Sequence, residues 1–231
     1  MPRVPRNLIL EEGLQTHKMW RSHNKERNID SNDEKALYLN LLNKELKRKN
    51  QSNNLNAYSL MSNHTHEVYD INNKKKFSDL MRNHHSRYGQ LFNINHQRSG
   101  KVAYDRPKTC LIESEHYSMN ATFYIHANPV KAGITKNAAN YRWSTHRLYA
   151  FGKRDRFSIN VKFPDWYMAL GKNFQERQKN YRKLFDAYLQ EQGLIDLNFL
   201  DKYSYGSPLW MMKITRRISL WRKENRLKDP P

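Results

Sequence analysis

Cysteine is almost absent from this chain of 231 residues, which contains only Cys110. A single cysteine excludes an intramolecular disulfide and a cysteine zinc site, and it is typical of a protein in a reducing compartment. No apolar run is long enough to span a membrane. Acidic residues interrupt the N-terminal stretch MPRVPRNLILEEG before it could act as a signal peptide. These absences predict a cytoplasmic protein with no membrane partner.

Acidic residues are also scarce. The chain has 22 Asp and Glu against 41 Lys and Arg, which gives a formal net charge of +19. Such an excess indicates a polyanionic partner, and nucleic acid is the commonest one for a protein outside a membrane. The alternative is an enzyme that is merely basic. Aromatic residues make up 12% of the chain, so we expect it to fold into one domain, or one domain with a small appendage.

Hydrophobic periodicity predicts a mixture of strands and helices. The expected strands cover residues 13–21, 56–62, 65–71 and 108–114, and the expected helices cover 31–50 and 76–93. The order strand, helix, strand, strand, helix, strand indicates an α+β, ferredoxin-like fold, an antiparallel sheet with both helices on one face. A further helix should follow Ser114, break or kink at Pro129 and stop at Gly133.

The character of the sequence changes from about residue 151. Two long, basic, amphipathic helices are expected over residues 169–193 and 210–228, and residues 152–165 connect them to the rest. We therefore divide the chain into a main domain, residues 1–150, and a small helical C-terminal appendage, residues 151–231. The appendage is a candidate DNA clamp because its last helix is rich in lysine and arginine.

Two histidines, His64 and His66, are separated by one residue beside the predicted strand 65–71. Residues i and i+2 of a strand point to the same face, so the two imidazoles would lie side by side, as two ligands of one divalent cation do. The alternative is a pair of polar residues on the solvated face of a sheet. In a chain with ten histidines the spacing alone favours that alternative.

Tyr124 and Asn128 are one turn apart on the helix that follows Ser114. A tyrosine hydroxyl and an amide oxygen on one face would suit a nucleophile beside a third metal ligand. The alternative is a helix that packs Tyr117 and Tyr124 into the core and ends at Asn128. Periodicity alone favours the alternative, because aromatic stripes are usually core.

Three segments together resemble the single-tyrosine transposases of the HUH superfamily, and most of all the REP-associated tyrosine transposases. They are AYSLMSNHTHEV, FYIHANPVKAG and YRWSTHRLY, in that order, within a similarity that covers residues 13–150. The matching positions are His64, His66, Tyr124, Asn128, Pro129, Val130, Gly133, Tyr141, Trp143 and Ser144. The chain departs from the family at Thr65, where relatives have a large apolar residue, and at Ser62, where they have proline.

The resemblance implies an HUH nuclease fold and a metal-dependent, single-stranded DNA endonuclease and strand transferase. Such a transposase cuts and rejoins DNA at hairpins such as REP palindromes through a 5′-phosphotyrosine intermediate. By position, Tyr124 would be the nucleophile, and His64 and His66 would bind Mg²⁺ or Mn²⁺. Asn128 would be the third ligand, one turn after the tyrosine, where relatives have glutamine.

The same resemblance carries expectations about partners and location. It implies single-stranded DNA with a hairpin as partner, no nucleotide cofactor, and a bacterial protein associated with the nucleoid. A monomer is favoured over a dimer. His17 also matches a family position, which we interpret as structural or close to DNA. A catalytically silent, domesticated protein that binds DNA hairpins is the alternative function.

Basic side chains that could neutralise DNA phosphates form several clusters, independently of the resemblance. The alternative for each residue is a solvated, basic surface position. The predicted DNA-binding residues are Lys74, Lys75, Lys76, Arg82, Arg87, Arg98, Lys101, Arg106, Lys108, Lys131, Arg216 and Arg217.

Overall fold

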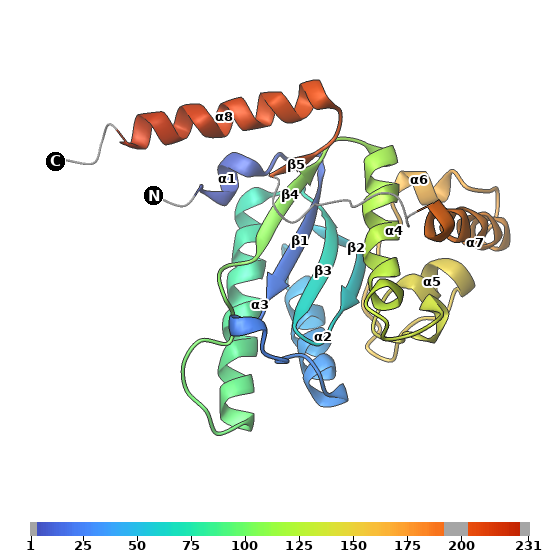
Figure 1. The fold of residues 1–231 in the computed structure, drawn as a ribbon, viewed down its shortest axis with the longest axis horizontal. Helices are drawn as coiled ribbons and strands as arrows, with labels where there is room; N and C mark the ends of the chain where they lie inside the picture. Colours follow the sequence, from blue (N-terminus) through green and yellow to red (C-terminus); the bar gives the residue numbers. More distant parts are fainter. Residues whose placement is uncertain (1–3, 192–202, 227–231) are drawn as a thin grey trace.

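The computed structural model describes residues 4–191 and 203–226. A five-stranded sheet with the order β2-β3-β1-β4-β5 lies at its centre (Figure 1). The strands are β1 (Gln15–Arg21), β2 (Asn54–Leu60), β3 (His64–Asp70), β4 (Lys108–Ile112) and β5 (Ser204–Tyr205). The first four strands pair antiparallel, as predicted, and β5 pairs with β4 in parallel. The two-residue β5 was not predicted, and it makes the sheet mixed.

Helices α2 (Asn32–Leu46) and α3 (Lys74–Asn95) cover one face of the sheet, as the ferredoxin-like order predicts. Helix α2 begins with a capping box, in which Ser31 Oγ accepts from Glu34 N and Glu34 Oε2 accepts from Ser31 N. The main core lies between these helices and the sheet, where Tyr38, Leu42 and Tyr88 are almost fully buried.

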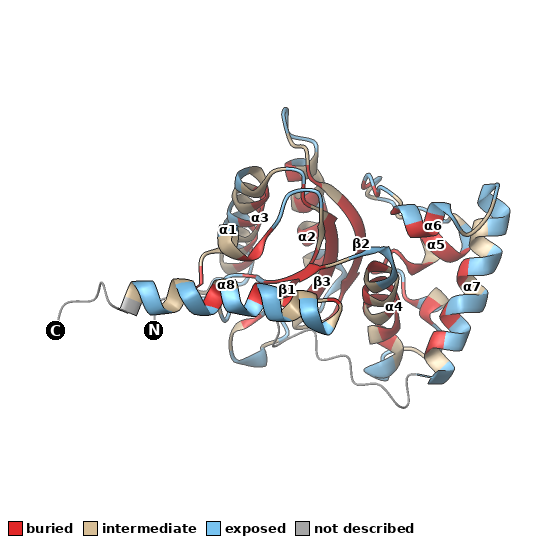
Figure 2. Ribbon diagram, turned by 90° about the horizontal axis from the view of Figure 1, so that it is seen from above, coloured by how far each residue is buried: buried red, intermediate tan, exposed pale blue. Residues whose placement is uncertain are grey.

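Helix α4 (Glu115–Lys131) packs on the opposite face of the sheet, beside β2 and β3 (Figures 1 and 2). Its apolar residues Ala121 and Ile125 meet Ala57, Val68 and Cys110 in a separate buried cluster, in which Ala121, Ala57 and Cys110 are small. Small side chains let the helix approach the strands closely, so a residue on this side of α4 is held near the residues of β3.

The predicted break of this helix at Pro129 is wrong, because α4 continues to Lys131. Proline lacks the backbone N–H that would donate to the carbonyl four residues earlier. Because Pro129 falls in the last turn of α4, only that one helical hydrogen bond is lost and few helical residues follow it. The helix continues past the proline, since Ala132 N donates to Asn128 O, and the chain beyond the helix donates to the next carbonyl through Ile134 N and Pro129 O. Gly133 ends the helix with φ of 68°, the left-handed conformation expected of a C-terminal glycine.

The remaining helices are short or lie toward the outside of the molecule (Figure 2). Helix α7 begins at Phe174 rather than residue 169, and it packs Tyr181 and Phe185 against Phe123 of α4. Helix α8 contacts α1 through Ile214 and Ile218. The ends predicted for these two helices, residues 192–193 and 227–228, lie outside the described residues. The bounds are α1 (Arg6–Ile9), α5 (His146–Phe151), α6 (Asp165–Met168), α7 (Phe174–Glu191) and α8 (Pro208–Arg226).

The proposed division after residue 150 stays a prediction. Part of the predicted appendage nevertheless shares the main core with the sheet, because Ile159, Trp166 and Tyr181 belong to the same buried cluster as Leu55 and Tyr58. Among the described residues, no helix is both long and apolar enough to cross a membrane.

Buried histidines predict that acid destabilises the fold. Burial lowers the pKa of His84 and His146 to about 4, and it lowers the pKa of His126 well below its ordinary value. The unfolded chain binds protons at these residues near pH 6.5, whereas the folded chain does not. Stability must therefore fall as the pH drops from 6.5 toward 4, with a slope that approaches about 1.4 kcal/mol per pH unit for each histidine.

Urea unfolding followed by circular dichroism at pH 7, 6 and 5, at constant ionic strength, measures this loss. A His146→Gln variant should show a smaller pH slope, because one of the buried histidines that contribute to it is gone. Equal stability at pH 7 and pH 5 would contradict the prediction.

Candidate active site on the α4 face of the sheet

His64 and His66 lie on the face of β3 that α4 covers. In the strand register they pair with Arg21 and Met19 of β1. Their ring centroids are 4.9 Å apart, with the ring planes nearly perpendicular. His66 is buried, whereas His64 stands at the start of the strand and is partly exposed. The sheet therefore places two imidazoles side by side where one of them can be reached from outside.

Both imidazoles make a hydrogen bond through Nδ1. His64 Nδ1 is 2.6 Å from Asn63 Oδ1, an amide oxygen that only accepts, so Nδ1 carries the proton. His66 Nδ1 is 2.8 Å from His17 Nε2. If His66 is the donor in that bond, both rings have an unprotonated Nε2. Neighbouring acceptors that hold one ring nitrogen in this way are typical of histidines that ligate metals.

His17 is the residue near the site that sequence reasoning underrated. It is buried on β1, and its ring stacks on that of His66 with centroids 5.0 Å apart. Burial, with a further effect of the Lys18 charge, lowers the pKa of His17 to about 3. The pairing of β1 with β3 brings His17 to His66, and only the register reveals this contact.

The histidines are neutral at physiological pH. Burial, followed by the charge of Arg21, lowers the pKa of His64 to about 4. Burial and the neighbouring His17 and His64 lower the pKa of His66 well below its ordinary value. Neutral imidazoles have a lone pair to offer, so neither ring would need to lose a proton before binding a cation.

Tyr124 of α4 lies against the same histidines. Its ring centroid is 5.7 Å from that of His66 and 6.4 Å from that of His17, edge-on in both cases. Lys131 Nζ lies 5.8 Å from the Tyr124 ring centroid. Tyr117, earlier on the same helix, packs against the Tyr205 ring instead, with centroids 4.9 Å apart. Tyr124 is therefore the tyrosine of α4 that stands beside the histidine pair.

Asn128 follows Tyr124 by one turn, and its side chain is unsatisfied. Its Nδ2 is buried without a hydrogen-bond partner among the described residues. A buried amide without a partner is costly, and rotation about its last torsion would present Oδ1 in the same place. Two neutral imidazoles and such an amide are a donor set that Mg²⁺ or Mn²⁺ could accept. Within the part of the chain described, no group of three or more His, Cys, Asp or Glu side chains could hold a metal ion.

The structure brings one predicted DNA-binding residue, Lys131, to Tyr124. Lys108 lies on β4 at the level of His66, because both pair with Met19 of β1. Arg98 forms a salt bridge with Glu26, and Arg106 donates to Val4 O. Lys101 is exposed in the same loop, which connects α3 to β4.

The remaining predicted DNA-binding residues lie elsewhere on the surface. Those of α3 lie on a helix that covers the opposite face of the sheet from α4. Lys74–Lys76 form the start of α3, which follows the end of β3 at Asp70, whereas His64 begins that strand. Arg82 there pairs with Asp79. Those of α8 lie beside α1, where Arg217 approaches Glu11 at 3.5 Å. The residues concerned are Lys74, Lys75, Lys76, Arg82, Arg87, Arg216 and Arg217.

No protein-family model and no curated protein matches this chain. A solved structure does match: a REP-associated tyrosine transposase bound to a REP hairpin, with a TM-score of 0.53. The chain shares the fold of a tyrosine transposase. The alignment covers 71% of this chain and 99% of the transposase chain, at 18% sequence identity. This likeness establishes the fold, and the reaction must be argued from the side chains.

Proposed function

We propose that this protein is a metal-dependent, single-stranded DNA endonuclease and strand transferase that acts beside DNA hairpins. The observation that carries the proposal is the contact of Tyr124 with His66, at 5.7 Å between ring centroids, next to His64. Support comes from the shared fold, since the similar transposase is bound to a REP hairpin. The formal charge of +19 also suits a DNA partner.

The residues that would hold the cation are His64, His66 and Asn128. His64 and His66 would each offer Nε2, because a hydrogen bond occupies Nδ1 of both rings. A bound Mg²⁺ or Mn²⁺ would polarise a backbone phosphate and stabilise charge on the departing 3′ oxygen.

Tyr124 would supply the nucleophile. Its hydroxyl oxygen forms a bond to phosphorus as the bond from phosphorus to the 3′ oxygen breaks. The tyrosine loses its proton and the 3′ oxygen gains one, which leaves a 5′-phosphotyrosine and a free 3′-hydroxyl. The reverse reaction rejoins the strand and needs no nucleotide, because the phosphotyrosine bond replaces the broken phosphodiester bond. Lys131, near the Tyr124 ring, is placed to attract the phosphate.

A catalytically silent protein that binds DNA hairpins is the second candidate. The departures at Ser62 and Thr65 favour it. The enzyme is the better proposal, because DNA binding alone gives no reason for a tyrosine beside two neutral histidines and an unsatisfied amide.

Covalent capture of DNA tests the proposed function. The protein is incubated with labelled, single-stranded hairpin DNA and Mn²⁺, and the products are separated on a denaturing gel. We expect a labelled band at the combined mass of protein and DNA, which is lost when EDTA replaces Mn²⁺. A wild-type protein that binds the hairpin and forms no adduct would support the silent alternative.

His17 is expected to act by positioning His66. His17→Phe keeps a flat, buried ring but removes the nitrogen that faces His66 Nδ1. We expect about 10–100-fold weaker Mn²⁺ binding, measured by calorimetry, because loss of a hydrogen-bond partner of a ligand has effects of that size. His17→Gln retains an acceptor and should bind Mn²⁺ more tightly than His17→Phe. Wild-type affinity in His17→Phe would rule out this role.

A further inference from the structure

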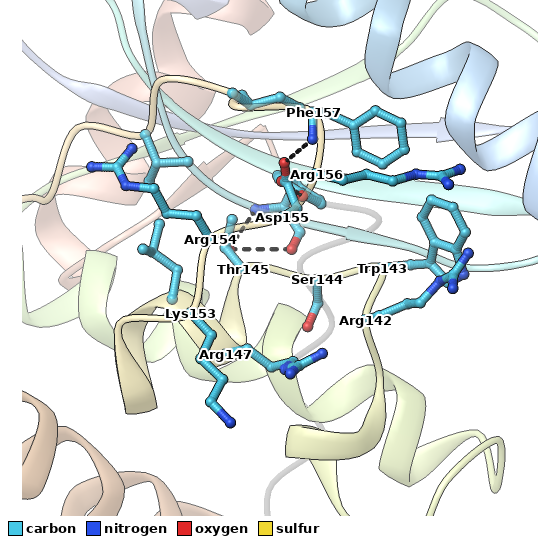
Figure 3. A pocket seen from close by; sticks show the side chains of 14 residues that line it. Arg142, Trp143, Ser144, Thr145, Arg147, Lys153, Arg154, Asp155, Arg156 and Phe157 are labelled. Carbon is cyan, nitrogen blue, oxygen red and sulfur yellow. Dashed lines mark hydrogen bonds between the residues drawn. The ribbon is translucent and has the colours of Figure 1, made fainter.

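A basic pocket lies beside the outer edge of β2, and its lining includes none of the four candidate site residues His64, His66, Tyr124 and Asn128. The segment Trp143–Thr145 runs along that edge, where Leu60 N donates to Trp143 O and Thr145 N donates to Tyr58 O. The pocket has a volume of about 220 Å³ and lies between this segment and residues 153–157 (Figure 3). It is too small for a duplex, but it is large enough to receive part of a nucleotide.

Cations dominate this pocket. Five basic side chains line it, and among the described residues none of them forms a salt bridge: Arg142, Arg147, Lys153, Arg154 and Arg156. The single acidic residue of the lining, Asp155, accepts hydrogen bonds from Tyr58 Oη and Phe157 N. Because its carboxylate is already engaged within the protein, the positive charge is left for a ligand from outside.

Flat side chains form one wall of the pocket. The Arg142 guanidinium lies 4.6 Å from the Trp143 ring centroid, and the Arg156 guanidinium lies 5.1 Å from that of Phe157. The rings of Trp143 and Phe157 stack at 6.0 Å with 29° between their planes. Figure 3 shows these four side chains together on one side of the pocket. Guanidinium groups and aromatic rings packed together are a surface on which unpaired bases stack.

The pocket neighbours the candidate active site across Trp143. A second cavity, of about 480 Å³, is lined by His64, Asn63, Tyr141 and Trp143. Trp143 therefore borders both cavities, which places the basic pocket next to the cavity at His64.

We propose that this basic pocket binds the single-stranded DNA segment that continues from the His64 and Tyr124 site. Its cations contact backbone phosphates, and a base lies against the wall formed by Trp143 and Phe157. This inference rests on the proposed function for the identity of the strand. A solvated basic surface is the competing explanation, but such a surface is not expected to be concave, aromatic and free of acidic partners at once.

Charge reversal at the pocket tests this inference without Mn²⁺. Arg154→Glu with Arg156→Glu changes two exposed side chains of the pocket. The matched control, Lys179→Glu with Lys183→Glu, makes the same change in net charge on exposed positions of α7. Fluorescence anisotropy measures the affinity for labelled oligothymidine and for a blunt DNA duplex, at several salt concentrations.

We expect the pocket variant to bind oligothymidine at least about tenfold more weakly than wild type, with a shallower salt dependence. The control should lose much less, and the pocket variant should lose less affinity for duplex than for oligothymidine. Equal losses in the two variants would show an effect of net charge only and overturn the inference. A loss confined to duplex would overturn it as well.

The outcomes separate this inference from the proposed function. If the wild-type protein forms the adduct and the pocket variant binds oligothymidine with unchanged affinity, the proposed function stands and the inference about the pocket fails. If the wild-type protein forms no adduct but the pocket variant binds oligothymidine weakly, the pocket stands as a binding site for single-stranded DNA and the proposed reaction fails.

Discussion

Tyr124→Phe is expected to abolish the covalent DNA adduct, with a loss of activity on the order of 10³-fold or more, as when an essential nucleophile is removed. Phenylalanine retains the ring that packs edge-on against His66 and His17, so the fold and the histidine pair should be preserved. Only the attacking oxygen disappears. The gel assay with labelled hairpin DNA and Mn²⁺ measures the effect.

Tyr117→Phe is the matched control, because it removes the same atom from the same helix. Tyr117 packs against Tyr205 and has no contact with the histidine pair in its described surroundings. This variant should form the adduct at close to the wild-type level. If the adduct persists in Tyr124→Phe and disappears in Tyr117→Phe, the nucleophile is Tyr117 and the assignment to Tyr124 is wrong. Unchanged DNA binding by both variants would show that only chemistry was altered.

Glu67→Ala is expected to destabilise the fold by about 3–5 kcal/mol, because it leaves Lys18 as an unpaired, buried charge. Lys18 Nζ lies 2.7 Å from Glu67 Oε1, and both side chains are fully buried. Burial lowers the pKa of Lys18 to about 8. Burial acts to raise the pKa of Glu67, but the charge of Lys18 and the hydrogen bonds to it hold that pKa below its ordinary value. Tyr38 and Tyr69 also donate to this carboxylate, so its removal leaves two hydroxyls without their acceptor.

Urea unfolding at pH 7 measures this effect. The double variant Lys18→Met with Glu67→Leu removes both charges and should be clearly more stable than Glu67→Ala, since apolar residues of similar volume can replace a buried pair. A loss below about 1 kcal/mol in Glu67→Ala would indicate that Lys18 finds another partner or loses its charge.

The buried ion pair also bears on the candidate active site. Lys18 and Glu67 each follow a histidine of the site in sequence, His17 and His66, on the two central strands. Successive residues of a strand point to opposite faces, so the ion pair lies under α2 and α3 while the histidines lie under α4. A slip of one residue would separate the charges and turn the histidines away from Tyr124. The ion pair is therefore expected to favour the register that the candidate site requires.

Local patterns determined much of this protein from sequence alone. Ser31 and Glu34 start α2, and Gly133 ends α4, because caps depend on residues a few positions apart. The spacing of His64 and His66 placed them on one face for the same reason. The one-turn offset of Tyr124 and Asn128 likewise put both on one side of α4. The ferredoxin-like fold of the first four strands and two helices followed from the order of the elements, since short connections allow few arrangements.

Contacts between distant segments were decided by the tertiary structure. His17 reaches His66, and β5 joins β4, only because strands pair in a particular register, which no local pattern specifies. The basic run at residues 153–156 was the available signal for the pocket, but its meaning depends on Trp143, which β2 holds beside it. Pro129 remains inside α4 because it falls in the last turn, where the one missing backbone donor does not interrupt the bonds that follow it. Sequence thus determined which groups are present and which face each occupies, whereas packing determined which of them meet, because a contact depends on the whole fold.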